Sequence, residues 1–182
     1  MNEQKITFKY LIACMGAVLL TWLIHEFTHW ITAESLGYDS ILRLNSVSPA
    51  TGHQWRGLHN VYVSATGPLI TIIQAVLAFV LFVNKGWIKT LYPFLFTPLY
   101  MRLLAGGMNF IKPNDEGRIS EYFGLGVFTL SIVVCLFLLF LVYKISKSYQ
   151  LSWKFNGWTI IIIMFASSLL ILGDQILNIR IL

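Results

Sequence analysis

The sequence predicts an all-α polytopic membrane protein, with about five transmembrane helices and a short β-hairpin-like loop between the first two. Two observations support this prediction. The mean hydropathy is +0.70, and only 12% of the residues are charged, against about 25% in a soluble domain. The chain also contains five apolar segments, each close to the roughly 20 residues that cross a hydrocarbon core. Residues 1–182 are therefore expected to form a single membrane-embedded domain.

The five apolar segments are expected to be helices, because an isolated segment in lipid must satisfy its own backbone hydrogen bonds. The first follows Lys5 and Lys9 and so imitates a signal peptide, but no small-x-small cleavage site follows, which favours a retained span. The third is the weakest, because Pro93 and Pro98 kink or interrupt it and Arg102 lies inside it. The predicted spans are roughly residues 8–32, 61–83, 91–111, 119–143 and 157–178.

The connection between the first two spans, residues 33–60, is the only long polar segment of the chain. Gly37 is typical of a residue that ends a helix. Residues 40–48, SILRLNSVS, alternate between apolar and polar, and the following SPATG is turn-like. Such alternation beside turn residues is typical of paired strands. We therefore expect a β-hairpin that lies near the membrane surface.

The distribution of charge indicates the orientation and the surroundings of the chain. The net charge of +5 comes mostly from loop residues, as is usual beside anionic lipid. No clustered basic face is present for nucleic acid, so the expected surrounding is the lipid bilayer of a multi-pass cell-membrane protein. The positive-inside rule puts the N-terminus in the cytoplasm. The N-terminal side would hold Lys5, Lys9, Lys85, Lys89, Lys144, Lys147 and Lys154, and the other side Arg43, Arg56, Lys112, Arg118 and Arg180.

The first span carries the motif HEFTH at residues 25–29. His25 and His29 lie about 40° apart around a helix, so their two imidazoles can bind one metal ion. Glu26 lies beside them, and HExxH on a helix is the signature of zinc metallopeptidases, in which the glutamate is the general base toward a water activated by the metal. The alternative is a pair of interfacial histidines near a helix end, although polar groups in an apolar run are costly without a role.

A catalytic zinc ion normally has three protein ligands and an open position, so a third ligand is needed. Glu34 points to another side of the first helix, and Asp174 has no supporting motif. His53 and His59 could reach from the polar loop, but nothing in the sequence positions them. Asp115 is better supported, because the fourth span enters the membrane on the side where the first span leaves it. The candidates are Glu34, His53, His59, Asp115, Glu116, Glu121 and Asp174.

Two further features are expected at the same membrane depth. The second span enters with SATGP, residues 64–68, and Asn109 closes the third span. Gly67 and Pro68 form either a tolerated kink or a break that lets a substrate backbone approach. Asn109 either caps a helix or belongs to an active site. Four spans would thus place polar or helix-breaking residues at one membrane depth, which a random distribution of such residues would not predict.

The motifs together resemble those of the site-2 protease family, the intramembrane zinc metalloproteases. HEFTH lies in a membrane helix, SATGP is similar to the Gly-Pro element of the next core helix, and NFIKPNDEGR at residues 109–118 is similar to the Asn…Pro…Asp-Gly motif. The resemblance implies that His25, His29 and Asp115 bind Zn²⁺ and that Glu26 activates water. It also implies that Asn109 stabilises the substrate carbonyl or its oxyanion.

The resemblance implies a three-helix core at roughly 8–32, 61–83 and 109–143, in a small divergent member in which Glu116 separates Asp115 from Gly117. The implied function is an intramembrane zinc metalloendopeptidase that hydrolyses transmembrane or juxtamembrane segments of a membrane-protein or peptide substrate. Two alternatives remain open. One is a non-proteolytic membrane metal-binding or scaffold protein with a degenerate site, and the other is a transporter.

Charged residues near the third motif are expected to be paired. Arg102 is costly in lipid and should either pair with a residue such as Glu121 or extend its charge to the membrane surface. Glu116 and Arg118 are expected to form a surface pair, unless Glu116 shifts toward the metal.

Overall fold

The computed structural model describes residues 4–50, 55–178 and 180–182. It confirms the predicted fold class, because the described residues form six α-helices and one small antiparallel hairpin. Four helices, α1, α2, α5 and α6, are long and apolar enough to cross a membrane. The elements are α1 (Phe8–Ser35), β1 (Ser40–Leu42), β2 (Val47–Pro49), α2 (Leu58–Lys85), the 3₁₀ turn η2 (Lys89–Leu91), α3 (Tyr92–Met108), α4 (Asp115–Tyr122), α5 (Thr129–Ser148) and α6 (Trp153–Leu177).

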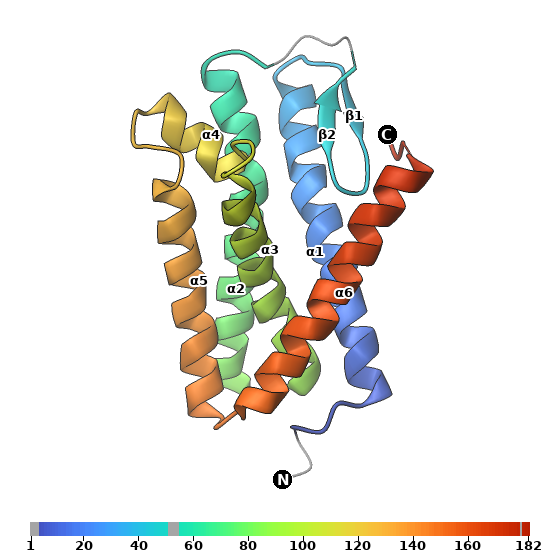
Figure 1. Ribbon diagram of the computed structural model, residues 1–182, viewed down its shortest axis with the longest axis vertical. Helices are drawn as coiled ribbons and strands as arrows, with labels where there is room; N and C mark the ends of the chain where they lie inside the picture. The colour runs from blue at the N-terminus through green and yellow to red at the C-terminus, as the bar shows by residue number, and fades with distance from the viewer. Residues whose placement is uncertain (1–3, 51–54, 179) are drawn as a thin grey trace.

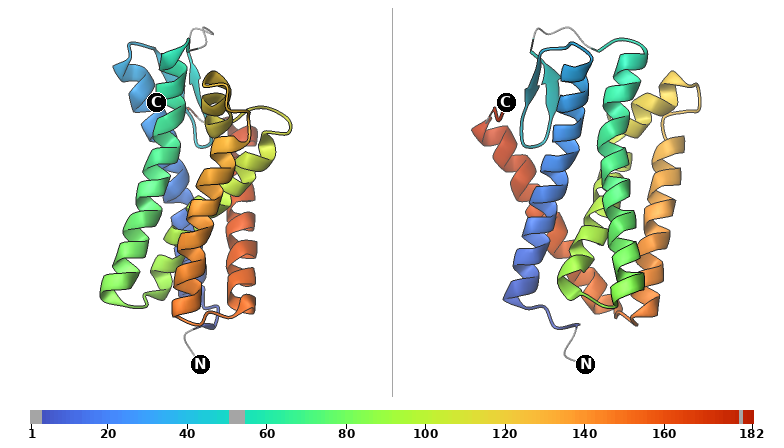
Figure 2. Two further views of the ribbon diagram at one scale, coloured as in Figure 1. Left: turned by 90° about the vertical axis from the view of Figure 1, so that its left-hand side faces the viewer. Right: turned by 180° about the vertical axis from the view of Figure 1, so that it is seen from behind.

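The long helices form a bundle in which consecutive members run in opposite directions, with α6 crossing the bundle obliquely (Figure 1). The hairpin and α4 lie at one end, and the start of α1 lies at the other (Figures 1 and 2). Large apolar side chains such as Leu69, Ile132 and Phe165 are exposed on the outer faces of the bundle. Because such surface is costly in water, these faces are suited to contact lipid.

Two of the predicted spans differ from the helices observed. The third, 91–111, corresponds to α3, which has 17 residues and is therefore shorter than the four candidate spans. Neither proline interrupts it. Pro93 lies in the first turn, where a backbone N–H is not needed, and the helix continues through Pro98. The fourth, 119–143, is wrong at its start, because α4 ends at Tyr122 and α5 begins only at Thr129.

Two glycines account for the break between α4 and α5. Gly124 and Gly126 have φ angles of 69° and 83°, in the left-handed region that favours glycine. Residues in that conformation end a helix, so the apolar run starting near residue 119 cannot form one continuous span. The break lets α4 lie across the end of the bundle instead of along it (Figure 1).

The predicted hairpin is confirmed, and it is anchored to the helices beneath it. Strand β1 pairs antiparallel with β2, with Leu42 opposite Val47. The turn lies between the two strands rather than at SPATG, of which residues 51 and 52 lie outside the described residues. Trp22 Nε1 donates to Asn45 Oδ1 at 2.7 Å, and the Leu44 amide donates to Asp174 Oδ1 at 3.1 Å. These bonds fix the tip of the hairpin over α1 and α6.

Candidate metal centre

The two histidines of HEFTH occupy one buried face of α1. His25 and His29 are 4% and 6% exposed, and their Nε2 atoms lie 3.1 Å apart. The spacing of four residues places both side chains on the same side of the helix. The predicted convergence of the two imidazoles is therefore present in the structure.

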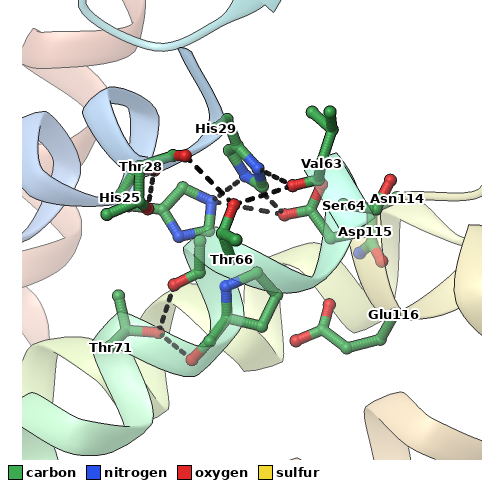
Figure 3. A network of polar contacts seen from close by, with 12 residues as sticks. His25, Thr28, His29, Val63, Ser64, Thr66, Thr71, Asn114, Asp115 and Glu116 are labelled. Atoms are coloured by element: carbon green, nitrogen blue, oxygen red, sulfur yellow. Dashed lines mark hydrogen bonds and ion pairs between the residues drawn. The ribbon is translucent and has the colours of Figure 1, made fainter. Parts of the chain in front are cut away.

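Asp115 brings a carboxylate to the same point from the start of α4. Its Oδ2 atom lies 3.2 Å from His25 Nε2 and 3.4 Å from His29 Nε2 (Figure 3). The local sequence explains this position, because the Asn114 side chain accepts a hydrogen bond from the Gly117 amide and caps the helix at the residue before Asp115. His25, His29 and Asp115 thus form a group of three residues that could hold a metal ion.

The distances within this group fit a tetrahedral zinc ion. Nitrogen and oxygen ligands lie about 2.0–2.2 Å from zinc, so two ligands of one tetrahedral ion are about 3.3–3.6 Å apart. The three separations here, 3.1, 3.2 and 3.4 Å, come within a few tenths of an ångström of those values. The donor set of two imidazoles and one carboxylate is also one that zinc accepts.

A backbone contact from α2 orients one of the histidines. His29 Nδ1 lies 2.5 Å from the carbonyl oxygen of Val63, which can only accept a hydrogen bond, so Nδ1 carries the proton (Figure 3). The lone pair of Nε2 is then directed at Asp115 and His25, as a metal ligand requires. His25 Nδ1 is buried and has no such partner among the described residues.

Arg118 orients the carboxylate in the same way. Its Nη2 donates to Asp115 Oδ1 at 2.6 Å, while its Nε donates to Ser64 Oγ at 2.9 Å. One carboxylate oxygen is thereby engaged, and the other faces the histidines. A charged guanidinium donor at this distance favours the ionised form of the carboxyl group. Asp115 is therefore a carboxylate at neutral pH.

Gly67 lies directly against the two imidazoles. A Cβ atom at this position would collide with the rings of His25 and His29. Of the two alternatives for Gly67 and Pro68, the break of α2 is not observed, because the helix runs from Leu58 to Lys85 through this proline. Thr71 Oγ1 donates to the carbonyl of Pro68 at 2.9 Å on the next turn. Because Gly67 has no side chain, α2 can closely approach the metal-binding face of α1.

We expect Gly67→Ala to weaken zinc binding by about tenfold or more, because the added methyl group must push at least one imidazole out of position. Gly16→Ala is the matched control, since Gly16 is also in a helix and a Cβ there meets nothing within 4 Å. Zinc affinity measured by competition with a chelator in detergent checks this. Equal affinities in the two variants would contradict the close contact.

Glu26 shares a cavity of about 220 Å³ with the three residues of the metal centre. It is 7% exposed, and its carboxylate forms no hydrogen bond with the described part of the chain. The hairpin contributes Asn45, Ser46 and Val47 to the wall of this cavity. The site therefore combines a possible metal centre, an available carboxylate and a strand edge.

Asn109 does not line this cavity, in contrast to the expected contact with a substrate carbonyl. Its Oδ1 accepts from the Asn114 amide at 2.8 Å, and its Nδ2 donates to Ser131 Oγ at 2.9 Å. Both ends of the side chain amide are thus used within the protein. This arrangement supports a role in holding the loop before Asp115, and the oxyanion role stays a prediction that the observed contacts do not favour.

The charged pairs also differ from those expected. Arg102 pairs with Glu116, at 2.8 Å between Nη1 and Oε1, and not with Glu121, which is exposed. Glu116 is 3% exposed, so it is no surface partner of Arg118. Its carboxylate also lies apart from the two histidines (Figure 3). The sequence predicted that Arg102 needs a partner but did not identify which one.

The remaining ligand candidates have other roles or lie elsewhere. Glu34 Oε1 accepts from the Ser40 amide at 2.8 Å, Asp174 holds the hairpin tip, and the His59 imidazole contacts the Tyr38 hydroxyl at 2.9 Å. His53 lies outside the described residues. Sequence reasoning missed the contact of Arg118 with Asp115, although the spacing of three residues on a helix would have indicated it.

A comparison of the chain with protein-family models, curated proteins and solved structures finds no match in any of the three. The resemblance to the site-2 protease family therefore depends on the motifs and on the geometry of the residues that carry them.

Proposed function

We propose that this protein is a membrane-embedded zinc metalloendopeptidase similar to the site-2 protease family. The observation that carries the proposal is the convergence of His25 Nε2, His29 Nε2 and Asp115 Oδ2 at separations of 3.1–3.4 Å, with Glu26 in the same cavity. Two imidazoles, one carboxylate and an adjacent glutamate are the groups that zinc-dependent peptide hydrolysis needs.

His25, His29 and Asp115 would hold the ion. A bound zinc ion would supply Lewis acidity and lower the pKa of water toward neutrality. No fourth His, Cys, Asp or Glu joins the group within the described part of the chain, which leaves a coordination position for chemistry. Arg118 would keep Asp115 Oδ2 directed at the ion by occupying Oδ1.

Glu26 would act as the proton carrier. Its carboxylate would take a proton from the attacking water as the new carbon–oxygen bond forms at the substrate carbonyl. It would then give that proton to the amide nitrogen as the carbon–nitrogen bond breaks, releasing a carboxylic acid and an amine. The carboxylate is suited to this exchange, because no described group holds it in a hydrogen bond.

The substrate would be an extended segment of a membrane protein or peptide. The cavity is lined by the histidine face of α1 and by the hairpin tip. The hairpin lies at one end of the bundle (Figure 1). A peptide there could pair with β2, whose first residue, Val47, lines the cavity, and present its backbone to Glu26. The lysines at the ends of α2 and α5 favour a cytoplasmic location for the opposite end of the bundle, with the site toward the exterior.

Chelation tests the proposal. We expect the purified protein in detergent to contain about one zinc ion per chain and to hydrolyse labelled casein or synthetic transmembrane peptides. Removing the metal with 1,10-phenanthroline should abolish hydrolysis, and adding Zn²⁺ should restore it. Zinc binding without hydrolysis of any of these peptides would favour the non-proteolytic metal-binding alternative. Absence of bound zinc would contradict the metal centre itself.

A further inference from the structure

Arg102 and Glu116 form a buried ion pair directly behind the metal centre. The two residues are 2% and 3% exposed, and Nη1 of the arginine lies 2.8 Å from Oε1 of the glutamate. The same Nη1 lies 3.8 Å from Asp115 Oδ2, the oxygen that faces both histidines. A buried cation is thus close to the carboxylate oxygen on which the metal centre depends.

The guanidinium would compete with a metal ion for that oxygen. Guanidinium groups bind carboxylates strongly, and a buried one must have a partner of opposite charge. In the described part of the chain, only Asp115 and Glu116 place a carboxylate oxygen within 4.0 Å of Arg102. If Glu116 were neutral, Asp115 would be the remaining partner, and its Oδ2 atom would turn from the histidines to the arginine.

The start of α4 separates the two carboxylates. Asp115 and Glu116 are consecutive residues of a helix, so their side chains point about 100° apart. One reaches the histidines and the other does not (Figure 3). The ion pair has little other support, because Arg102 Nε and Glu116 Oε2 are buried without hydrogen-bond partners among the described residues. Arg102 is therefore held mainly by its contact with one glutamate oxygen.

We propose that Glu116 is a positioning residue that holds Arg102 away from Asp115, so that Asp115 Oδ2 stays free to bind the metal. The inference rests on the proposed metal centre and adds a residue to it. Glu116 is not among the residues that line the cavity of the metal centre, and it would act only through Arg102. Its charge is consequently needed only while Arg102 is charged and present.

Zinc affinity of the full-length protein tests this, measured in detergent by competition with a chromophoric chelator. We expect Glu116→Gln to weaken zinc binding by about tenfold or more. The double variant R102M/E116Q should bind zinc within about threefold of the unsubstituted protein, because replacing both members of a buried pair by neutral residues of similar size is usually tolerated. Glu121→Gln is the control, as this exposed residue lies on the same helix.

Thermal unfolding of the zinc-free proteins separates positioning from folding. A merely structural role predicts that zinc affinity falls only as far as stability does and that the two recover together in the double variant. A positioning role predicts that E116Q loses more zinc affinity than its loss of stability explains. The inference is overturned if E116Q binds zinc like the unsubstituted protein or if R102M/E116Q stays as weak as E116Q. If E116Q is not recovered folded, the double variant decides alone, and a tenfold loss in it overturns the inference.

The outcomes also distinguish this inference from the proposed function. If the unsubstituted protein binds no zinc, the metal centre and the role of Glu116 are both overturned. If it binds zinc but cleaves no peptide, the peptidase proposal is wrong while the affinity series still decides the role of Glu116.

Discussion

Replacing Glu26 by glutamine should reduce peptide hydrolysis by roughly 10²–10⁴-fold, the range that a positioned general base contributes. Glutamine has nearly the same shape, but its amide cannot take a proton from water at neutral pH. Zinc binding should stay within about threefold of the unsubstituted protein, because Glu26 is not among the three residues that converge on the ion. Initial rates of peptide cleavage and zinc content, measured on the same preparations, check both parts.

The control for this substitution is Glu121→Gln, which makes the same chemical change at an exposed position of α4. It should leave the rate and the zinc content unchanged. Full proteolysis by the Glu26→Gln protein would exclude Glu26 as the base. A parallel loss of zinc would show instead that Glu26 supports the metal centre, and the slower reaction would then say nothing about proton transfer.

The sequence predicted the parts of the fold that depend on local patterns. Apolar segments of sufficient length predicted the long helices, and the alternation in SILRLNSVS predicted the hairpin. The predicted start of the fourth span was wrong, because hydropathy carries no information about backbone conformation. Gly124 and Gly126 adopt positive φ angles and end α4 inside a segment that is otherwise apolar enough to continue.

The sequence predicted those parts of the site whose positions depend on a single helix or on the side of the membrane at which a span begins or ends. The pairing of His25 with His29 follows from helical periodicity. The approach of Asp115 was predicted because the fourth span was expected to enter the membrane on the side where the first span leaves it. The partner of Arg102 did not follow, because it depends on how α4 packs across α3. That packing decides whether Glu116 or Glu121 faces the arginine, and sequence distance carries no information about it.

Removing the third ligand should have the largest effect on the metal. We expect Asp115→Ala to weaken zinc binding by more than about 100-fold, since even loss of a group that only orients a ligand costs about 10–100-fold. Hydrolysis should be lost with the metal. The zinc-free protein should still fold, because Arg102 keeps its contact with Glu116 and the Arg118 side chain, 34% exposed, can be hydrated instead. Its stability should nevertheless fall by about 1–3 kcal/mol, because Asp115 is itself mostly buried and its loss leaves buried polar groups without their partner.

Chelator competition measures the zinc affinity, and thermal unfolding of the zinc-free proteins measures the stability. Asp39→Ala is the matched control, because Asp39 is exposed and its side chain forms no ion pair within the described part of the chain. Unchanged zinc affinity in Asp115→Ala would mean that the ion, if bound, takes its third ligand from elsewhere. His53, which lies outside the described residues, would then become the next candidate for substitution, since the other loop histidine, His59, is engaged by the Tyr38 hydroxyl.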